Sequence, residues 1–109
     1  MSTERRAGRR IHRRLHLTIG NFDAWTTNVS ASGLQIAIPI ADLPRFRQAL
    51  REERFHAAVD VPDAGAIAIE GQVRYISDHG DEFLAGVLIE HIEGGTAAWA
   101  DFIGSLGAA

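Results

Sequence analysis

Short runs in which apolar and polar residues alternate follow one another along most of the chain. The run 15–19 alternates, a Gly-Asn pair follows it, and residues 22–29 continue the pattern. A period of two is typical of β-strands with one buried face, so these two runs predict a hairpin. The same pattern predicts strands at 34–40, 55–61, 66–77 and 83–90, with turn residues between them. Pro39 favours the edge or the end of its strand.

Two segments have the spacing of helices. Residues 42–54 place their apolar side chains at helical intervals, and Asp42 can cap the first turn. A second helix is predicted from Thr96 onward, where one stripe holds Trp99, Phe102, Ile103 and Leu106. Six short strands with one inserted and one terminal helix predict a mainly β fold, a small six-stranded antiparallel barrel.

Length and composition narrow the class of protein. A chain of 109 residues, 46% of them hydrophobic, is the size of one domain. It has no cysteine, which excludes disulfides and thiolate chemistry. No apolar run approaches the roughly 18 residues of a membrane span, and no secretion signal is evident at the start. We therefore expect a cytoplasmic protein with no membrane span.

Positive charge is concentrated at one end of the chain. Residues 1–14 hold six arginines and one glutamate, net +5, so the rest carries −8 of a total of −3. Such a block is typical of a solvated terminal arm that either pairs with the acidic body or binds an anion.

Catalytic and metal-binding patterns are absent from the sequence. Only His12 and His16 are four residues apart, and no helix is predicted there, so we expect no metal site. Ser30 and Ser32 lack the surroundings of a catalytic nucleophile, and the acids within 78–82 are typical turn formers. We expect no enzymatic activity and no catalytic residue.

The arginines and the segment "NVSASG", residues 28–33, together indicate a guanine ligand. Arginine binds phosphate or one edge of guanine with its planar fork and can stack on a base. Asn28 can accept from guanine N1 or N2, Ser30 offers a hydroxyl, and Gly33 lets the backbone turn tightly or approach a ligand.

These motifs resemble those of PilZ domains, bacterial receptors for cyclic di-GMP. The family pattern R-x-x-x-R before the first strand can be read here as Arg9 to Arg13 or as Arg10 to Arg14, and "NVSASG" matches [D/N]-x-S-x-x-G. The segments "EGQVRYI" (70–76) and "AGVLIE" (85–90) are similar to the family's late hairpin. The resemblance covers residues 9 to 106 and implies a PilZ-type barrel.

The resemblance also implies the site. It assigns the ligand to Arg9, Arg10, Arg13, Arg14, Asn28, Ser30 and Gly33, with the rest of 9–109 as a single domain behind a flexible basic arm, 1–8. The Arg10–Arg14 register is favoured because Arg14 directly precedes the strand. Arg9 would then stand where the family has an arginine associated with two intercalated ligand molecules. The family more often has aspartate at position 28, and we expect Asn28→Asp to bind at least as tightly.

The expected function is that of a receptor and adaptor. Cyclic di-GMP would order the arm against the barrel and so alter binding to an unidentified protein partner, in motility, exopolysaccharide or biofilm control. The helix 42–54, with arginines at 45, 47, 51 and 54, could belong to the partner surface, but we favour a helix that covers one barrel opening.

Two alternatives remain open. A degenerate PilZ adaptor would bind no nucleotide, and a small basic-armed barrel would bind nucleic acid. We consider nucleic acid unlikely as a partner because it calls for exposed aromatic platforms. Alternation suggests instead that most of the strand aromatics face inward, namely Phe22, Trp25, Phe55, Tyr75 and Phe83.

Overall fold

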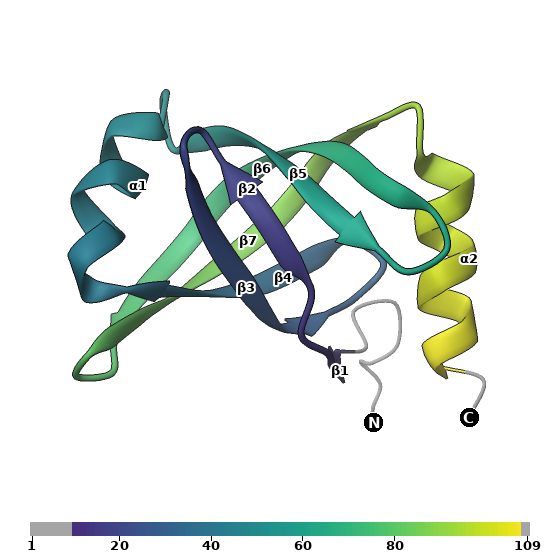
Figure 1. The fold of residues 1–109 in the computed structure, drawn as a ribbon, viewed down its shortest axis with the longest axis horizontal. Helices are drawn as coiled ribbons and strands as arrows, with labels where there is room; N and C mark the ends of the chain where they lie inside the picture. Colours follow the sequence, from purple (N-terminus) through teal and green to yellow (C-terminus); the bar gives the residue numbers. More distant parts are fainter. Residues whose placement is uncertain (1–9, 108–109) are drawn as a thin grey trace.

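The computed structural model describes residues 10–107 of the chain (Figure 1). The strands are β1 (Ile11–His12), β2 (His16–Ile19), β3 (Phe22–Val29), β4 (Gly33–Pro39), β5 (Arg54–Val61), β6 (Gly65–Asp78) and β7 (Glu82–Glu93). The helical segments are the 3-10 turn η2 (Ile40–Asp42) and the helices α1 (Leu43–Ala49) and α2 (Thr96–Gly107). Every strand predicted from the alternation is present, and Pro39 ends its strand as expected.

The strands β2 to β7 close into a barrel in which every neighbouring pair is antiparallel. The order along the sheet is β1-β3-β2-β5-β6-β7-β4, and a further pairing of β3 with β4 joins the two ends. The six-stranded antiparallel barrel predicted for the chain is confirmed. Closure matters because it leaves no long unpaired strand edge.

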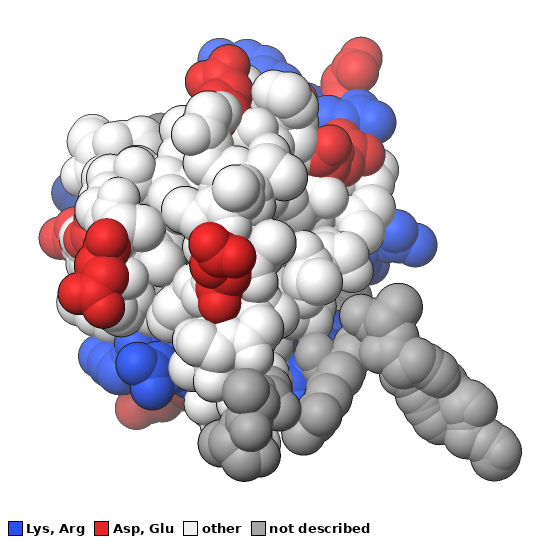
Figure 2. Space-filling view, turned by 90° about the vertical axis from the view of Figure 1, so that its right-hand side faces the viewer, with Lys and Arg blue, Asp and Glu red and all other residues white. Residues whose placement is uncertain are grey.

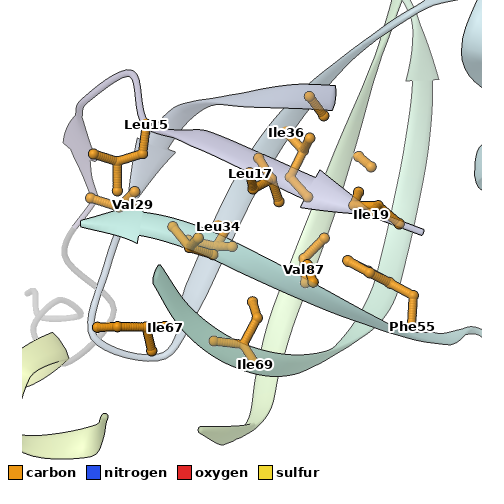
Figure 3. Packing of buried hydrophobic residues seen from close by; sticks show 14 of the residues in the cluster. Leu15, Leu17, Ile19, Val29, Leu34, Ile36, Phe55, Ile67, Ile69 and Val87 are labelled. Atoms are coloured by element: carbon orange, nitrogen blue, oxygen red, sulfur yellow. The ribbon is translucent and has the colours of Figure 1, made fainter. Parts of the chain in front are cut away.

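The alternating apolar residues fill the barrel (Figure 3). Leu17, Ile19, Ile36 and Val59 are completely buried, and their polar neighbours lie on the outside. Removal of apolar side chains from water is the main term that stabilises such a core.

The helices cover the two ends of the barrel (Figure 1). Phe46 of α1 is fully buried and meets Phe22 and Phe55 edge-on, at ring centroid distances of 6.5 and 5.4 Å. At the other end, α2 buries Trp99 and Phe102. The inserted helix thus covers a barrel opening, as favoured from the sequence. Neither helix of the described region is long and apolar enough to cross a membrane.

The inserted helix is shorter than the predicted 42–54. It ends at Ala49, and Leu50 is extended. Arg51 and Arg54 then face each other across a tight turn, because Arg54 already pairs with Gln72 as the first residue of β5. Residues 51–54, with two of the four arginines considered for a partner surface, therefore lie outside the helix.

The strand register changes where the basic arm enters the barrel. Strand β1 continues β2 along the same side of β3, with Ile11 opposite Val29 and His16 opposite Trp25. The two registers differ by one residue, so the segment 13–15 bulges. The hydroxyl of the buried Thr26 bonds to the Leu15 amide and the Arg13 carbonyl within the bulge.

The strand aromatics do not mostly face inward, contrary to the sequence-based expectation. Of the five, only Phe22 and Phe55 are buried. Trp25 lies between two inward residues of β3 and so points outward, while Tyr75 is 41% exposed. Trp25 and Tyr75 thus provide outward-facing aromatic rings, which nucleic-acid binding calls for.

Candidate ligand site

The two predicted motifs meet at the first strand pairing. His12 of β1 pairs with Asn28 of β3, which brings Arg10, two residues earlier, alongside the start of the 28–33 segment. The Arg10 guanidinium donates a long hydrogen bond of 3.5 Å to Oδ1 of Asn28. Arg9 lies outside the described residues.

The loop between β3 and β4 is held from three sides. The amide of Ser30 donates to the carbonyl of Gly33 at 2.9 Å, and the buried Ser30 hydroxyl points at the same oxygen at 3.4 Å. The amide of Ile89 donates to the Ser32 carbonyl at 2.8 Å, and the Trp99 indole of α2 donates to the Ala31 carbonyl at 3.2 Å. Ser30 therefore stabilises the conformation of the loop.

Gly33 is needed here because of strand pairing. A Cβ at this position would lie 2.9 Å from the carbonyl oxygen of Val87 on β7. The structure thus explains this glycine by a close backbone approach within the protein, a reason that the motif alone did not indicate.

A hollow of about 170 Å³ opens between the arm, the loop and the late hairpin. Three of the predicted site residues line it, Arg10, Ser30 and Gly33, together with Ser32, Arg74, Tyr75, Gly86, Val87 and Leu88. A larger hollow of about 400 Å³ near Thr18 is lined by two carboxylates and two histidines but no arginine. For an anionic ligand, the hollow with two arginines is the better candidate.

Tyr75, Arg74 and Gly86 were not among the predicted site residues. Tyr75 is paired with Gly86 across β6 and β7, and its ring lies where a Cβ of residue 86 would be. Arg74 is the extra residue of a bulge between Val73 and Tyr75. Gly86 belongs to the "AGVLIE" segment that resembles the family's late hairpin, but the ring that covers it depends on strand register.

Gln35 of β4 links this ring to the loop. Its Nε2 donates to the Tyr75 hydroxyl at 2.8 Å, and its Oε1 accepts from the Thr27 hydroxyl at 2.8 Å and from Nδ2 of Asn28 at 3.3 Å. The hydrogen bond from Gln35, and then hydrogen bonding and charge from the nearby Arg10 guanidinium, lower the pKa of Tyr75.

The other described arginines of the arm lie against aromatic rings. The guanidinium of Arg13 lies 5.8 Å from the ring centre of Phe102, on α2, and that of Arg14 lies 5.0 Å from the ring of Trp25. Neither ring belongs to the 28–33 loop. Arg10 is thus brought together with Asn28, Ser30 and Gly33, while Arg13 and Arg14 lie against rings outside the loop and do not line the hollow. The arginine register stays a prediction.

A charged cluster lies next to Trp25 on the outer surface. The His16 ring meets Asp60 of β5 at 2.7 Å through Nδ1 and Asp23 of β3 at 2.8 Å through Nε2. Its edge also faces the Trp25 ring at 5.5 Å. The hydrogen bonds to Asp60, then to Asp23, raise the pKa of His16.

Charge elsewhere is scattered. On the face seen in Figure 2, acidic and basic side chains are interspersed, several of them side by side near the rim, with no basic stripe. Among residues 10–107, no group of three or more histidine or acidic side chains is placed to hold a metal ion.

Comparison with known proteins supports the fold. No protein-family model matches the sequence, and no curated protein sequence matches it. The solved structure of the Bacillus subtilis inhibitor of motility (MotI/DgrA) is similar, with a TM-score of 0.74 and 17% sequence identity over 97% of this chain. The match covers 51% of that chain, so the present protein spans about half its length. At this identity, the likeness concerns the fold.

Proposed function

We propose that the protein is a receptor for cyclic di-GMP that acts by binding another protein and has no catalytic activity. The observation that carries the proposal is the meeting of Arg10 with Asn28 beside a hollow lined by Ser30 and Gly33. Residues of two motifs, far apart in the sequence, thereby surround one site of the chemistry that a guanine dinucleotide requires.

Each residue has a role that follows from its chemistry. Oδ1 of Asn28 accepts from guanine N1 or N2, while the Arg10 guanidinium moves from Asn28 to the O6 and N7 edge or to a phosphate. The ligand carries two negative charges, and Arg10 and Arg74 both line the hollow. Arg14, which lies over the Trp25 ring, supplies a third cation from one side.

The switch is more limited than a whole arm that folds onto the barrel. Because β1 pairs with β3 and Arg10 bonds to Asn28, residues 10–12 are already attached to the barrel. Ligand binding in our proposal reorients the arginine side chains and draws Arg9 and the preceding residues to the same site. A change in that surface then alters binding to a protein partner.

The process we favour is motility. A protein with a similar fold carries the name inhibitor of motility. Control of exopolysaccharide or biofilm formation by the same messenger stays an alternative, and the partner itself remains to be found by its dependence on ligand.

Isothermal titration with cyclic di-GMP at near-physiological salt tests the proposal, with GTP as the control nucleotide. Arg10→Ala and Arg14→Ala should weaken binding by roughly tens to thousands of fold, the usual cost of losing one desolvated charged contact. Arg47→Ala is the matched control, because Arg47 lies on α1 at the far end of the barrel (Figure 1). A stoichiometry of two ligands per chain would support the intercalated pair and a role for Arg9.

The alternatives give different results. Wild-type protein that is folded and takes up no cyclic di-GMP would refute the receptor and favour the degenerate adaptor. Binding to oligonucleotides that grows with their length and falls steeply with salt would favour the nucleic-acid barrel.

A further inference from the structure

Asn28, the residue proposed to accept from guanine, belongs to a ring of hydrogen-bonding groups. Arg10 donates to Asn28, Asn28 donates to Gln35, and Gln35 donates to the hydroxyl of Tyr75. Tyr75 lies beside Arg10 again, since both line the same hollow and the charge of Arg10 acts on the tyrosine hydroxyl. Gln35 is the only member of the ring on β4, between Asn28 on β3 and the hairpin of β6 and β7.

The chemistry of the side chains determines which atom donates and which accepts at each step of this ring. A guanidinium has only donors, so the atom of Asn28 that faces Arg10 must be Oδ1. The Asn28 amide nitrogen then faces Gln35, which must present Oε1, and the Gln35 nitrogen is left for Tyr75. The Thr27 hydroxyl adds a second donor to the same Oε1 at 2.8 Å.

The orientation of the Asn28 amide decides which base edge it can read. Guanine presents the donors N1–H and N2–H, which require an acceptor. Adenine presents N1 as an acceptor and N6 as a donor, so an asparagine that can turn over accommodates it. An asparagine with its oxygen held outward prefers guanine.

We propose that Gln35 is a positioning residue that holds the Asn28 oxygen toward the ligand and thereby makes the site select guanine over adenine. The inference rests on the proposed function. When the Arg10 side chain moves to the ligand, the bond from Asn28 to Gln35 still ties down the amide nitrogen. Reversal of Asn28 then requires Gln35 to turn as well, which would bring its oxygen to Tyr75 and its nitrogen to Thr27.

The test compares cyclic di-GMP with cyclic di-AMP by titration, with competition for the weaker ligand. Gln35→Leu removes both polar atoms and frees the Asn28 amide. The ratio of the two affinities should fall about tenfold, the discrimination that one oriented hydrogen bond supplies. Both ligands carry the same charge, so the ratio is insensitive to general electrostatic effects.

Asn28→Asp provides the matched control. A carboxylate has two acceptors and no amide to orient, and Gln35 can turn to donate to it. In the Asn28→Asp background, Gln35→Leu should therefore leave the ratio unchanged. A merely structural role for Gln35 would lower the ratio by the same factor in both backgrounds.

The outcomes separate this inference from the proposed function. If wild-type protein binds neither dinucleotide, both fail. If wild-type protein binds cyclic di-GMP, and folded Gln35→Leu keeps the wild-type ratio or shifts it equally in both backgrounds, only the positioning role of Gln35 is overturned.

Discussion

Thr26→Val tests whether one buried hydroxyl holds the arm at its entry to the barrel. Thr26 is 1% exposed, and its Oγ1 accepts from the amide of Leu15 at 2.8 Å and donates to the carbonyl of Arg13 at 2.6 Å. Because of the bulge at 13–15, these two backbone groups do not take part in the hydrogen bonds between the strands. Valine has nearly the same shape and can make neither bond.

The magnitude follows from the groups left unpaired. A buried polar group without a partner costs about 1 to 3 kcal/mol. The Leu15 amide is buried, whereas the bond to Arg13 lies at a partly buried edge where water can enter. We therefore expect Thr26→Val to lower the free energy of unfolding by about 3 kcal/mol. Thr26→Ser keeps the hydroxyl and loses one methyl, which costs about 1 kcal/mol.

Urea unfolding measures the difference. With a denaturant dependence of about 2 kcal/mol per molar, the midpoint of Thr26→Val should lie roughly 1.5 M below wild type, and that of Thr26→Ser about 0.5 M below. Equal midpoints for the two variants, or a more stable valine variant, would show that the hydroxyl does not hold the bulge.

Two further predictions concern pH and packing. Because the hydrogen bonds from His16 to Asp60 and Asp23 raise the pKa of His16 above 6.5, its stabilising effect is complete below about pH 6.5 and is lost as pH rises through the raised pKa. The urea midpoint of wild type minus that of His16→Gln should therefore decrease as pH rises above about 6.5 and passes through the raised pKa, and a difference that stays constant with pH would contradict the assignment. Gly86→Ala should cost about 1 to 3 kcal/mol because its methyl would overlap the ring of Tyr75, and much less when made in Tyr75→Ala. Additive effects in that double-mutant cycle would mean that the ring is not what requires the glycine.

The strands and the barrel could be predicted because the alternation of apolar and polar residues within each strand shows which of its faces is buried. The end of the inserted helix could not, since nothing within 50–54 is unfavourable to a helix. It is the pairing of Arg54 with Gln72, distant in the sequence, that starts a strand there. The bulge at 13–15 likewise depends on a hydroxyl contributed by another strand.

The candidate site likewise contains residues that could be predicted from local motifs and residues that could not. Asn28, Ser30 and Gly33 could be found because they form one contiguous motif, and Arg10 because it belongs to a repeated spacing. Gln35 and Tyr75 meet only through the register of β4, β7 and β6, with Gln35 and Tyr75 both opposite Gly86. Such a pair has no signature in a single sequence until the strand order is known.

The positions of the two tryptophans make the protein its own optical reporter. Trp25 lies under the Arg14 guanidinium, and Trp99 donates its indole hydrogen to Ala31 in the loop. Trp25 is half-buried, whereas Trp99 is 2% exposed, so their emission spectra differ. Trp25→Phe leaves an emitter that follows the loop, and Trp99→Phe leaves one that follows the arm. The two halves of the site can therefore be followed separately in unlabelled protein.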